Sequence, residues 1–84
     1  MTKLVYFAWV RERIGLSEEE IALPENVITV SDLLAFLRQR GEEYELALCE
    51  PDIIRVALDK AHAEHDEPVR NASEIALFPP MTGG

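Results

Sequence analysis

Short apolar runs alternate with polar, glycine and proline positions along the 84-residue chain. The first run, residues 3–8, is rich in β-prone residues and alternates weakly, so it predicts a strand that is buried on both faces. Residues 9–15 predict a short helix that Gly15 can end. Residues 18–23 predict an antiparallel return strand, which Pro24 closes.

The most regular pattern covers residues 31–40, where apolar residues recur along one side of a helix. Ser31 is suited to be the N-cap, Asp32 lies in the first turn, and Gly41 follows the last turn. We therefore expect an amphipathic core helix here. Residues 42–49 are ambiguous and could form a second short helix.

Two further strands are predicted at residues 53–58 and 74–78. Asp59 and Lys60 indicate a turn after the first of them, and Asn71, which tolerates left-handed angles, indicates another before the second. The order strand, strand, helix, strand, strand allows one helix to cover a mixed sheet, as in a β-grasp fold. We expect an α+β fold with a sheet of four to five strands, in a single domain over residues 1–84.

Alternation in the last predicted strand separates its side chains between the two faces of the sheet. Ile75 and Leu77 share one face, whereas Ala76 and Phe78 share the other. Phe78 is therefore expected to point away from the helix.

Charge and composition limit the classes of binding partner and the cellular compartment that we expect. Sixteen acidic and eight basic residues give a net charge of -8, which repels nucleic acids and anionic membranes, so neither is expected as a partner. The acidic excess serves either as a solubilising surface or as a docking face for a basic partner. The single cysteine, the lack of a signal-peptide pattern and the lack of a long apolar segment favour a cytoplasmic protein.

Side-chain chemistry offers few candidates. His62, His65 and Asp66 lie within five residues of each other, but a structural zinc site usually needs four placed ligands, often cysteines, so a solvated polar connection is favoured and no metal is expected. Cys49 has no C-x-x-C partner and is expected to pack, or half pack, as a small apolar residue. No glycine loop that could hold a phosphate is present in the sequence, so no bound cofactor is expected.

The ending "FPPMTGG" is the remaining candidate. Pro79 and Pro80 favour an extended arm, and two terminal glycines keep its tip thin. The reactive group would be the α-carboxylate of Gly84, which needs activation, for example as an adenylate, before it accepts a sulfur or nitrogen nucleophile. The alternative is a frayed terminus that happens to contain two glycines.

Three stretches together support an activated C-terminus: the ending "EIALFPPMTGG", the opening "KLVYFAWVRERIG" and the segment "SDLLAFL". Over its whole length the sequence resembles the small subunits of molybdopterin synthase, a family of ubiquitin-like β-grasp sulfur carriers. The resemblance implies that a ubiquitin-activating-type adenylyltransferase uses ATP to adenylate Gly84 and that a sulfur donor system converts it to a thiocarboxylate. The synthase large subunit then receives the tail, and sulfur passes to cyclic pyranopterin monophosphate to form the molybdopterin dithiolene.

The same resemblance implies roles for individual residues and an assembly. Gly84 would carry the sulfur in a chain that is a non-catalytic subunit of a heterotetramer of two small and two large subunits. His62 stands at a position that is often apolar in relatives. The segment that threads the partner would be the flexible tail, which consists of Pro79, Pro80, Met81, Thr82 and Gly83. The partner-docking residues would be Phe78, Phe7 and His62. Phe7 is equally compatible with a place in the core.

Two rival functions stay open at this point. One is a β-grasp sulfur carrier for another pathway, such as thiamine, tungsten cofactor or amino-acid synthesis, with the same tail chemistry. The other is a ubiquitin-like interaction domain whose terminus is never activated.

Overall fold

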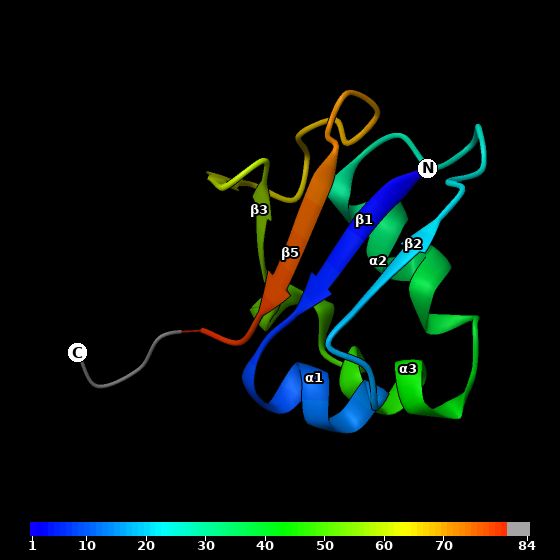
Figure 1. Ribbon diagram of the computed structural model, residues 1–84, viewed down its shortest axis with the longest axis vertical. Helices are drawn as coiled ribbons and strands as arrows, with labels where there is room; N and C mark the ends of the chain where they lie inside the picture. The colour runs from blue at the N-terminus through cyan, green and yellow to red at the C-terminus, as the bar shows by residue number, and fades with distance from the viewer. Residues whose placement is uncertain (81–84) are drawn as a thin grey trace.

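The computed structural model describes residues 1–80 of the chain, which form a five-stranded sheet with helices (Figure 1). The strands are β1 (Thr2–Tyr6), β2 (Glu18–Ile21), β3 (Arg55–Leu58), β4 (Ala61–Ala63) and β5 (Glu74–Phe78). The helices are α1 (Ala8–Ile14), α2 (Val30–Arg38) and α3 (Glu42–Ala47), with a 3-10 turn at Pro51–Ile53. The residue that follows α1, Gly15, adopts the left-handed conformation at φ 90°, as expected for a helix-ending glycine.

The sheet has the order β2-β1-β5-β3-β4, and its central pair is parallel. The other neighbours, β1 with β2, β3 with β5 and β3 with β4, are antiparallel. Figure 1 shows β1 and β5 running side by side in the same direction. This is the mixed sheet of a ubiquitin-like β-grasp fold, and it confirms the predicted fold class.

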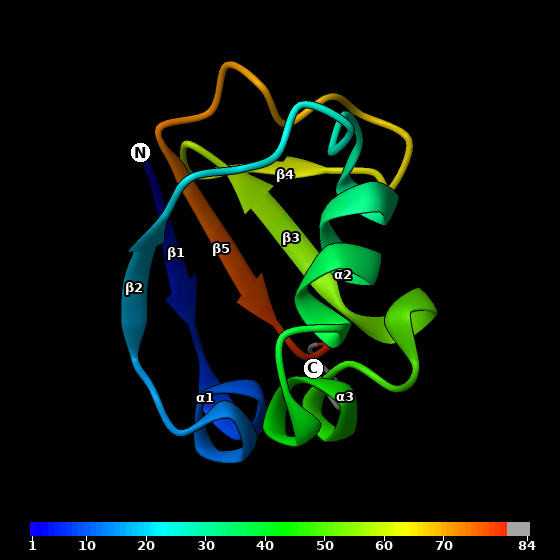
Figure 2. The same ribbon diagram turned by 90° about the vertical axis from the view of Figure 1, so that its right-hand side faces the viewer.

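Helix α2 lies across one face of the sheet (Figure 2). Its apolar residues Leu33, Leu34 and Leu37 are buried in one core with residues of the central strands. Helices α1 and α3 pack against each other at the end of the sheet toward which β1 and β5 run (Figures 1 and 2). The hydrophobic core therefore lies between α2 and one face of the sheet.

Helix α2 begins earlier than expected, and the prediction of Ser31 as N-cap is wrong. Thr29 is the cap: its Oγ1 accepts from Asp32 N at 3.2 Å, and Asp32 Oδ2 accepts from Thr29 N at 3.1 Å. The Ser31 N–H instead donates to the carbonyl of His65 at 2.9 Å. Because the loop after β4 supplies this acceptor, the helix can begin before Ser31.

Strand β1 is not buried on both faces, contrary to prediction. Leu4 and Tyr6 are buried under the helices, whereas Lys3 and Val5 stay partly exposed. Within residues 1–80, α2 covers only one face of the sheet, which we call the covered face (Figure 2). We call the opposite side the open face.

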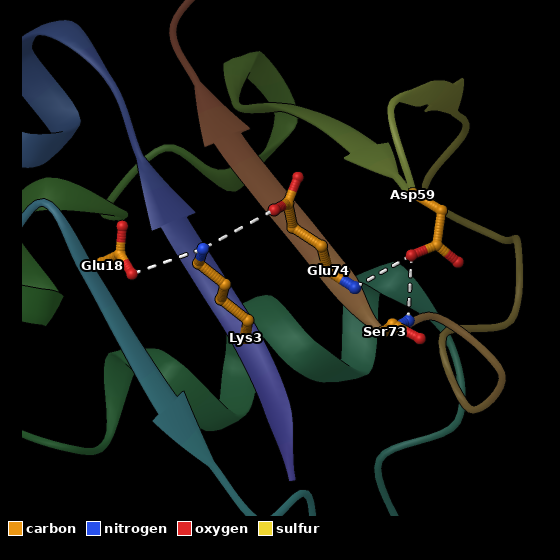
Figure 3. A network of polar contacts seen from close by, with 5 residues as sticks. All are labelled: Lys3, Glu18, Asp59, Ser73 and Glu74. Atoms are coloured by element: carbon orange, nitrogen blue, oxygen red, sulfur yellow. Dashed lines mark hydrogen bonds and ion pairs between the residues drawn. The ribbon is translucent and has the colours of Figure 1, made fainter.

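The connection between β3 and β4 is the predicted turn, and it is a two-residue hairpin loop. Asp59 and Lys60 have φ of 49° and 73°, the left-handed pair of a type I′ turn. The following residues form β4, so the prediction of a loop there was incomplete. Asn71 does not adopt the expected left-handed angle. The turn before β5 is held instead by Asp59 Oδ1, which accepts from the backbone N of Ser73 and Glu74 (Figure 3).

Candidate docking surface and tail root

The tail leaves the sheet at the end of β5, beside α1 (Figure 1). Phe78 is the last strand residue, and Pro79 and Pro80 after it are half-buried. The predicted threading and sulfur-carrying residues Met81, Thr82, Gly83 and Gly84 lie outside the described residues. The structure thus describes the root of the tail, residues 78–80, and the surface around it.

Strand β5 divides its side chains between the two faces as predicted. Ile75 and Leu77 are fully buried on the covered face. Ala76 and Phe78 are half-buried on the open face. The expectation that Phe78 points away from the helix is confirmed; whether it docks a partner stays a prediction.

The pairing register places a row of small residues across the middle of the open face. Val5 is opposite Ala76, Ala76 is opposite Ala57, and Ala57 is opposite His62. Val5, Ala76 and Ala57 are half-buried, because no helix within residues 1–80 covers them. Another protein surface could approach the sheet backbone closely along this row. Alternation had already placed Ala76 on the face of Phe78, but Val5 and Ala57 were not predicted, because only the strand register brings them next to Ala76.

Phe7 continues this surface at the tail end of the sheet. Its backbone N donates to the carbonyl of Leu77 at 3.1 Å, so it lies next to the end of β5. Its side chain is 46% exposed, which decides against a place in the core. Phe78, the last residue of β5, and Phe7, which directly follows β1, therefore border the root of the tail.

His62 lies on β4, at the far end of the same row, and is exposed. Its Nε2 is 4.0 Å from Oε1 of Glu64. A metal site, the alternative considered for the sequence, would combine His62 with His65. Nε2 of His65 instead lies 2.8 Å from the carbonyl oxygen of Ile54. In the part of the chain that the structure describes, no group of three or more His, Cys, Asp or Glu residues could hold a metal ion.

Charged residues occupy the other end of the open face, away from the tail root. Lys3 Nζ lies 3.4 Å from Glu18 Oε2 and 4.0 Å from Glu74 Oε2, so one cation bridges β2 and β5 across β1 (Figure 3). Lys3 and Glu74 therefore make the open face charged where β1 and β5 begin.

A polar network that the sequence analysis did not anticipate closes the edge of the covered face. Glu19 Oε2 accepts hydrogen bonds from the hydroxyls of Tyr6 and Tyr44, both at 2.7 Å, and Glu19 Oε1 pairs with Arg40 Nη1 at 3.1 Å. Alternation contained a usable signal, because Glu19 is two residues before the buried Ile21 and so faces the same side. The network joins β1, β2 and α3.

The network shifts the pKa values of its members. Burial would raise the pKa of Glu19, but the hydrogen bonds from Tyr6, Tyr44 and Arg40 outweigh it and lower that pKa. Burial and then the Glu19 hydrogen bond raise the pKa of Tyr44 to about 12, and the same causes raise the pKa of Tyr6 strongly. Glu19 is thus held as a carboxylate between two neutral phenols.

Cys49 does not pack, contrary to prediction, and is exposed. The preceding residues Ala47 and Leu48 are buried at the end of α3, and the chain then turns outward. Among the described residues, no helix is long and apolar enough to cross a bilayer.

Comparison with known proteins gives concordant matches. The ThiS family matches residues 4–84. A molybdopterin synthase sulfur carrier subunit of Haemophilus influenzae is 36% identical over 84 residues, 100% of both chains, and that of Escherichia coli is 33% identical over the same span. Among solved structures, a candidate subunit 1 of molybdopterin converting factor from Pyrococcus furiosus matches with a TM-score of 0.73 at 28% identity, covering 95% of this chain and 97% of that one.

Proposed function

Because this chain belongs to the ThiS family, we propose that it is the sulfur-carrier subunit of a molybdopterin synthase. The observation that carries the proposal is the end-to-end match with two relatives that bear this name. Both alignments cover 100% of this chain and therefore include Gly84. The chain contributes a carrier and a docking surface, and its partners contribute the catalytic groups.

The chemistry is proposed to take place on the α-carboxylate of Gly84. A carboxylate is a poor electrophile, so a partner adenylyltransferase first joins it to the adenylate of ATP, and pyrophosphate leaves. Sulfide, or a sulfide equivalent supplied by a donor system, then attacks the acyl carbon, and AMP leaves. The result is a thiocarboxylate, and the nucleotide is bound by the partner rather than by this chain.

The tail is proposed to deliver this sulfur inside the large subunit. Pro79 and Pro80 favour an extended path, and Gly83 leaves room for a narrow channel. Met81 and Thr82 are the remaining threading residues. Sulfur then passes to cyclic pyranopterin monophosphate, where positioning of the two reactants lowers much of the barrier. Two deliveries complete the dithiolene.

The open face is proposed to dock these partners. Phe7 and Phe78 border the tail root, and His62 ends the row of small residues that crosses the sheet. Half-buried apolar side chains at the exit of a functional tail support a protein interface, because a partner would remove them from water. The assembly we expect is a heterotetramer of two such chains and two large subunits.

Intact mass tests the carrier chemistry. Protein isolated from cells that contain the whole pathway should include a species heavier by one oxygen-to-sulfur exchange, and protein from cells without the adenylyltransferase should not.

Two variants complete the test: deletion of Gly84, and addition of one residue after it. Both should abolish sulfur delivery while the fold and large-subunit binding remain. An interaction domain with an inactive terminus would tolerate both changes.

Complementation separates molybdopterin synthesis from the rival sulfur-carrier pathways. Strains that lack each carrier are given the wild-type gene, and molybdoenzyme activity and thiamine independence are measured. We expect molybdoenzyme activity to return. Restoration of thiamine synthesis alone would assign the carrier to the other pathway.

A further inference from the structure

The cross-strand partner of Phe78 is an arginine, although this chain carries twice as many acidic as basic residues. Arg55 is opposite Phe78 in the register of β3 and β5, so both side chains lie on the open face at the tail root. Arg55 is exposed. A positive charge therefore stands beside the apolar border of the tail.

Arg55 differs from Arg38 and Arg40, the two arginines that pair with carboxylates. Arg38 pairs with Glu45 at 3.0 Å and Arg40 with Glu19 at 3.1 Å, whereas within residues 1–80 no carboxylate lies within 4.0 Å of the Arg55 guanidinium. Arg11, Arg13 and Arg70 share this property, but the first two lie on α1 and Arg70 lies in the loop before β5, so all three are outside the strands. The cation on the charged end of the open face, Lys3, is already bridged by two glutamates (Figure 3). Among the Arg and Lys residues of the described strands on this face, Arg55 is thus the one without a carboxylate partner.

We propose that Arg55 fixes the docking register of the open face by pairing with a carboxylate of the large subunit, an inference that rests on the function proposed above. Arginine suits this role because its planar fork binds a carboxylate through two parallel hydrogen bonds. On a chain of net charge -8 a single cation adds little long-range attraction. Its contribution is local, and it selects one orientation of the partner over others.

The alternative ligand, a phosphate of the activated terminus, is disfavoured by distance. Gly84 lies six positions after Phe78 in the sequence. An extended segment of that length reaches about 20 Å, so an adenylate or pterin phosphate at the tip of an extended tail would lie far from Arg55. A protein carboxylate on the docked surface is the anion that remains within reach.

Affinity for the purified large subunit tests this inference, with charge reversal at two sites. Arg55→Glu should weaken binding about tenfold or more at low salt, since it places like charges together, and Arg55→Lys should retain most of the affinity. Arg70→Glu is the matched control. It makes the same charge change just before β5, at the end of the sheet opposite the tail, and should change affinity less than about twofold.

The readouts separate failure of this inference from failure of the proposed function. Circular dichroism of each variant and thermal unfolding of the Arg55 variants should match the wild type, whereas Arg70→Glu loses the hydrogen bond from Arg70 Nη1 to the carbonyl of Glu25 and need only stay folded at the assay temperature. Binding of Arg55→Gln, which is neutral, should fall between those of wild type and Arg55→Glu. A large-subunit Asp→Lys or Glu→Lys variant that restores Arg55→Glu binding would identify the partner carboxylate. Equal affinities of Arg55→Glu and Arg70→Glu would overturn the inference, while the carrier function would stand. A wild-type chain that fails to bind the large subunit would contradict the proposed function itself.

Discussion

The five residues of β5 alternate between two faces of the sheet, and the two faces differ in burial. On the covered face, Ile75 and Leu77 are 0% exposed in the core beneath α2. On the open face, Ala76 and Phe78 are half-buried and no helix packs on them within the described part of the chain. Alternate positions of one strand therefore have separate roles: one set stabilises the fold and the other is accessible to partners. Substitutions on the two faces should therefore affect stability and binding separately.

Truncation on the covered face should have the largest effect on stability. Leu77→Ala removes a fully buried side chain from the centre of the core and should cost about 3 kcal/mol of unfolding free energy. Urea denaturation followed by circular dichroism measures this loss. The neighbouring residue provides the control, since Phe78→Ala on the open face should cost clearly less. Equal losses for the two variants would contradict the division between the faces.

The network at the edge of the covered face should have the next largest effect. Glu19→Gln preserves the shape of the side chain but removes a carboxylate that accepts from two tyrosines and an arginine, so it should cost about 2 kcal/mol at pH 7. Tyr44→Phe, which removes one of these donors, should cost less. A Glu19→Gln protein as stable as the wild type would mean that the network contributes nothing.

The same network predicts a pH dependence with a definite sign. The pKa of Glu19 is lowered in the folded protein, so folding favours its ionised form. Its contribution is fully present above the unfolded pKa of about 4.3, and it is lost as the pH falls below that value through the lowered folded pKa. Unfolding free energies measured between pH 3 and pH 7 should therefore converge for wild type and Glu19→Gln at the acid end. A gap that stays constant with pH would exclude Glu19 as its source.

The sequence predicted local patterns well and non-local pairing poorly. The main helix, the alternation of β5 and the Asp59–Lys60 turn follow from neighbouring residues, and all three are present. Strand β4 was missed because Ala-His-Ala has little intrinsic β-propensity and forms a strand only by pairing with β3. The N-cap was misplaced because the loop after β4 supplies acceptors to α2.

The candidate site shows the same limit. Phe7, Phe78 and the tail could be named from local sequence, and the partial exposure of both aromatic side chains agrees with a place outside the core. The residues that share their face, such as Arg55 and Ala57, become neighbours only through the order and register of the strands. The exposure of Cys49 likewise depends on how α3 ends. Without the pairing, these residues carry no distinguishing signal.

A stabilising substitution in the β3–β4 turn should have a smaller effect. Lys60 holds φ of 73°, a left-handed angle that costs a residue with a Cβ about 1 kcal/mol. Lys60→Gly creates the Asp-Gly pair favoured in type I′ turns and should raise stability by up to about 1 kcal/mol. Thermal unfolding checks this, and Lys60→Ala, which removes the charge but keeps the Cβ, is the control. A gain in the alanine variant as large as in the glycine variant would indicate a charge effect.

The smallest stability effect is expected at Phe7, where the comparison of faces is tested most directly. Phe7→Ala removes a side chain that is 46% exposed, so it should cost only about 0.5–1 kcal/mol. Ile28→Ala is a matched control, because Ile28 is 48% exposed but lies in the loop before α2. Both variants should unfold at similar urea concentrations.

Only Phe7→Ala, however, should weaken binding to the large subunit, by about tenfold or more if Phe7 is a central contact of the interface. Titration calorimetry with the two variants and the wild type measures the difference. A loss of about 3 kcal/mol of unfolding free energy in Phe7→Ala would indicate that Phe7 belongs to the core. Unchanged binding would remove Phe7 from the docking surface and leave Phe78 as the aromatic contact beside the tail.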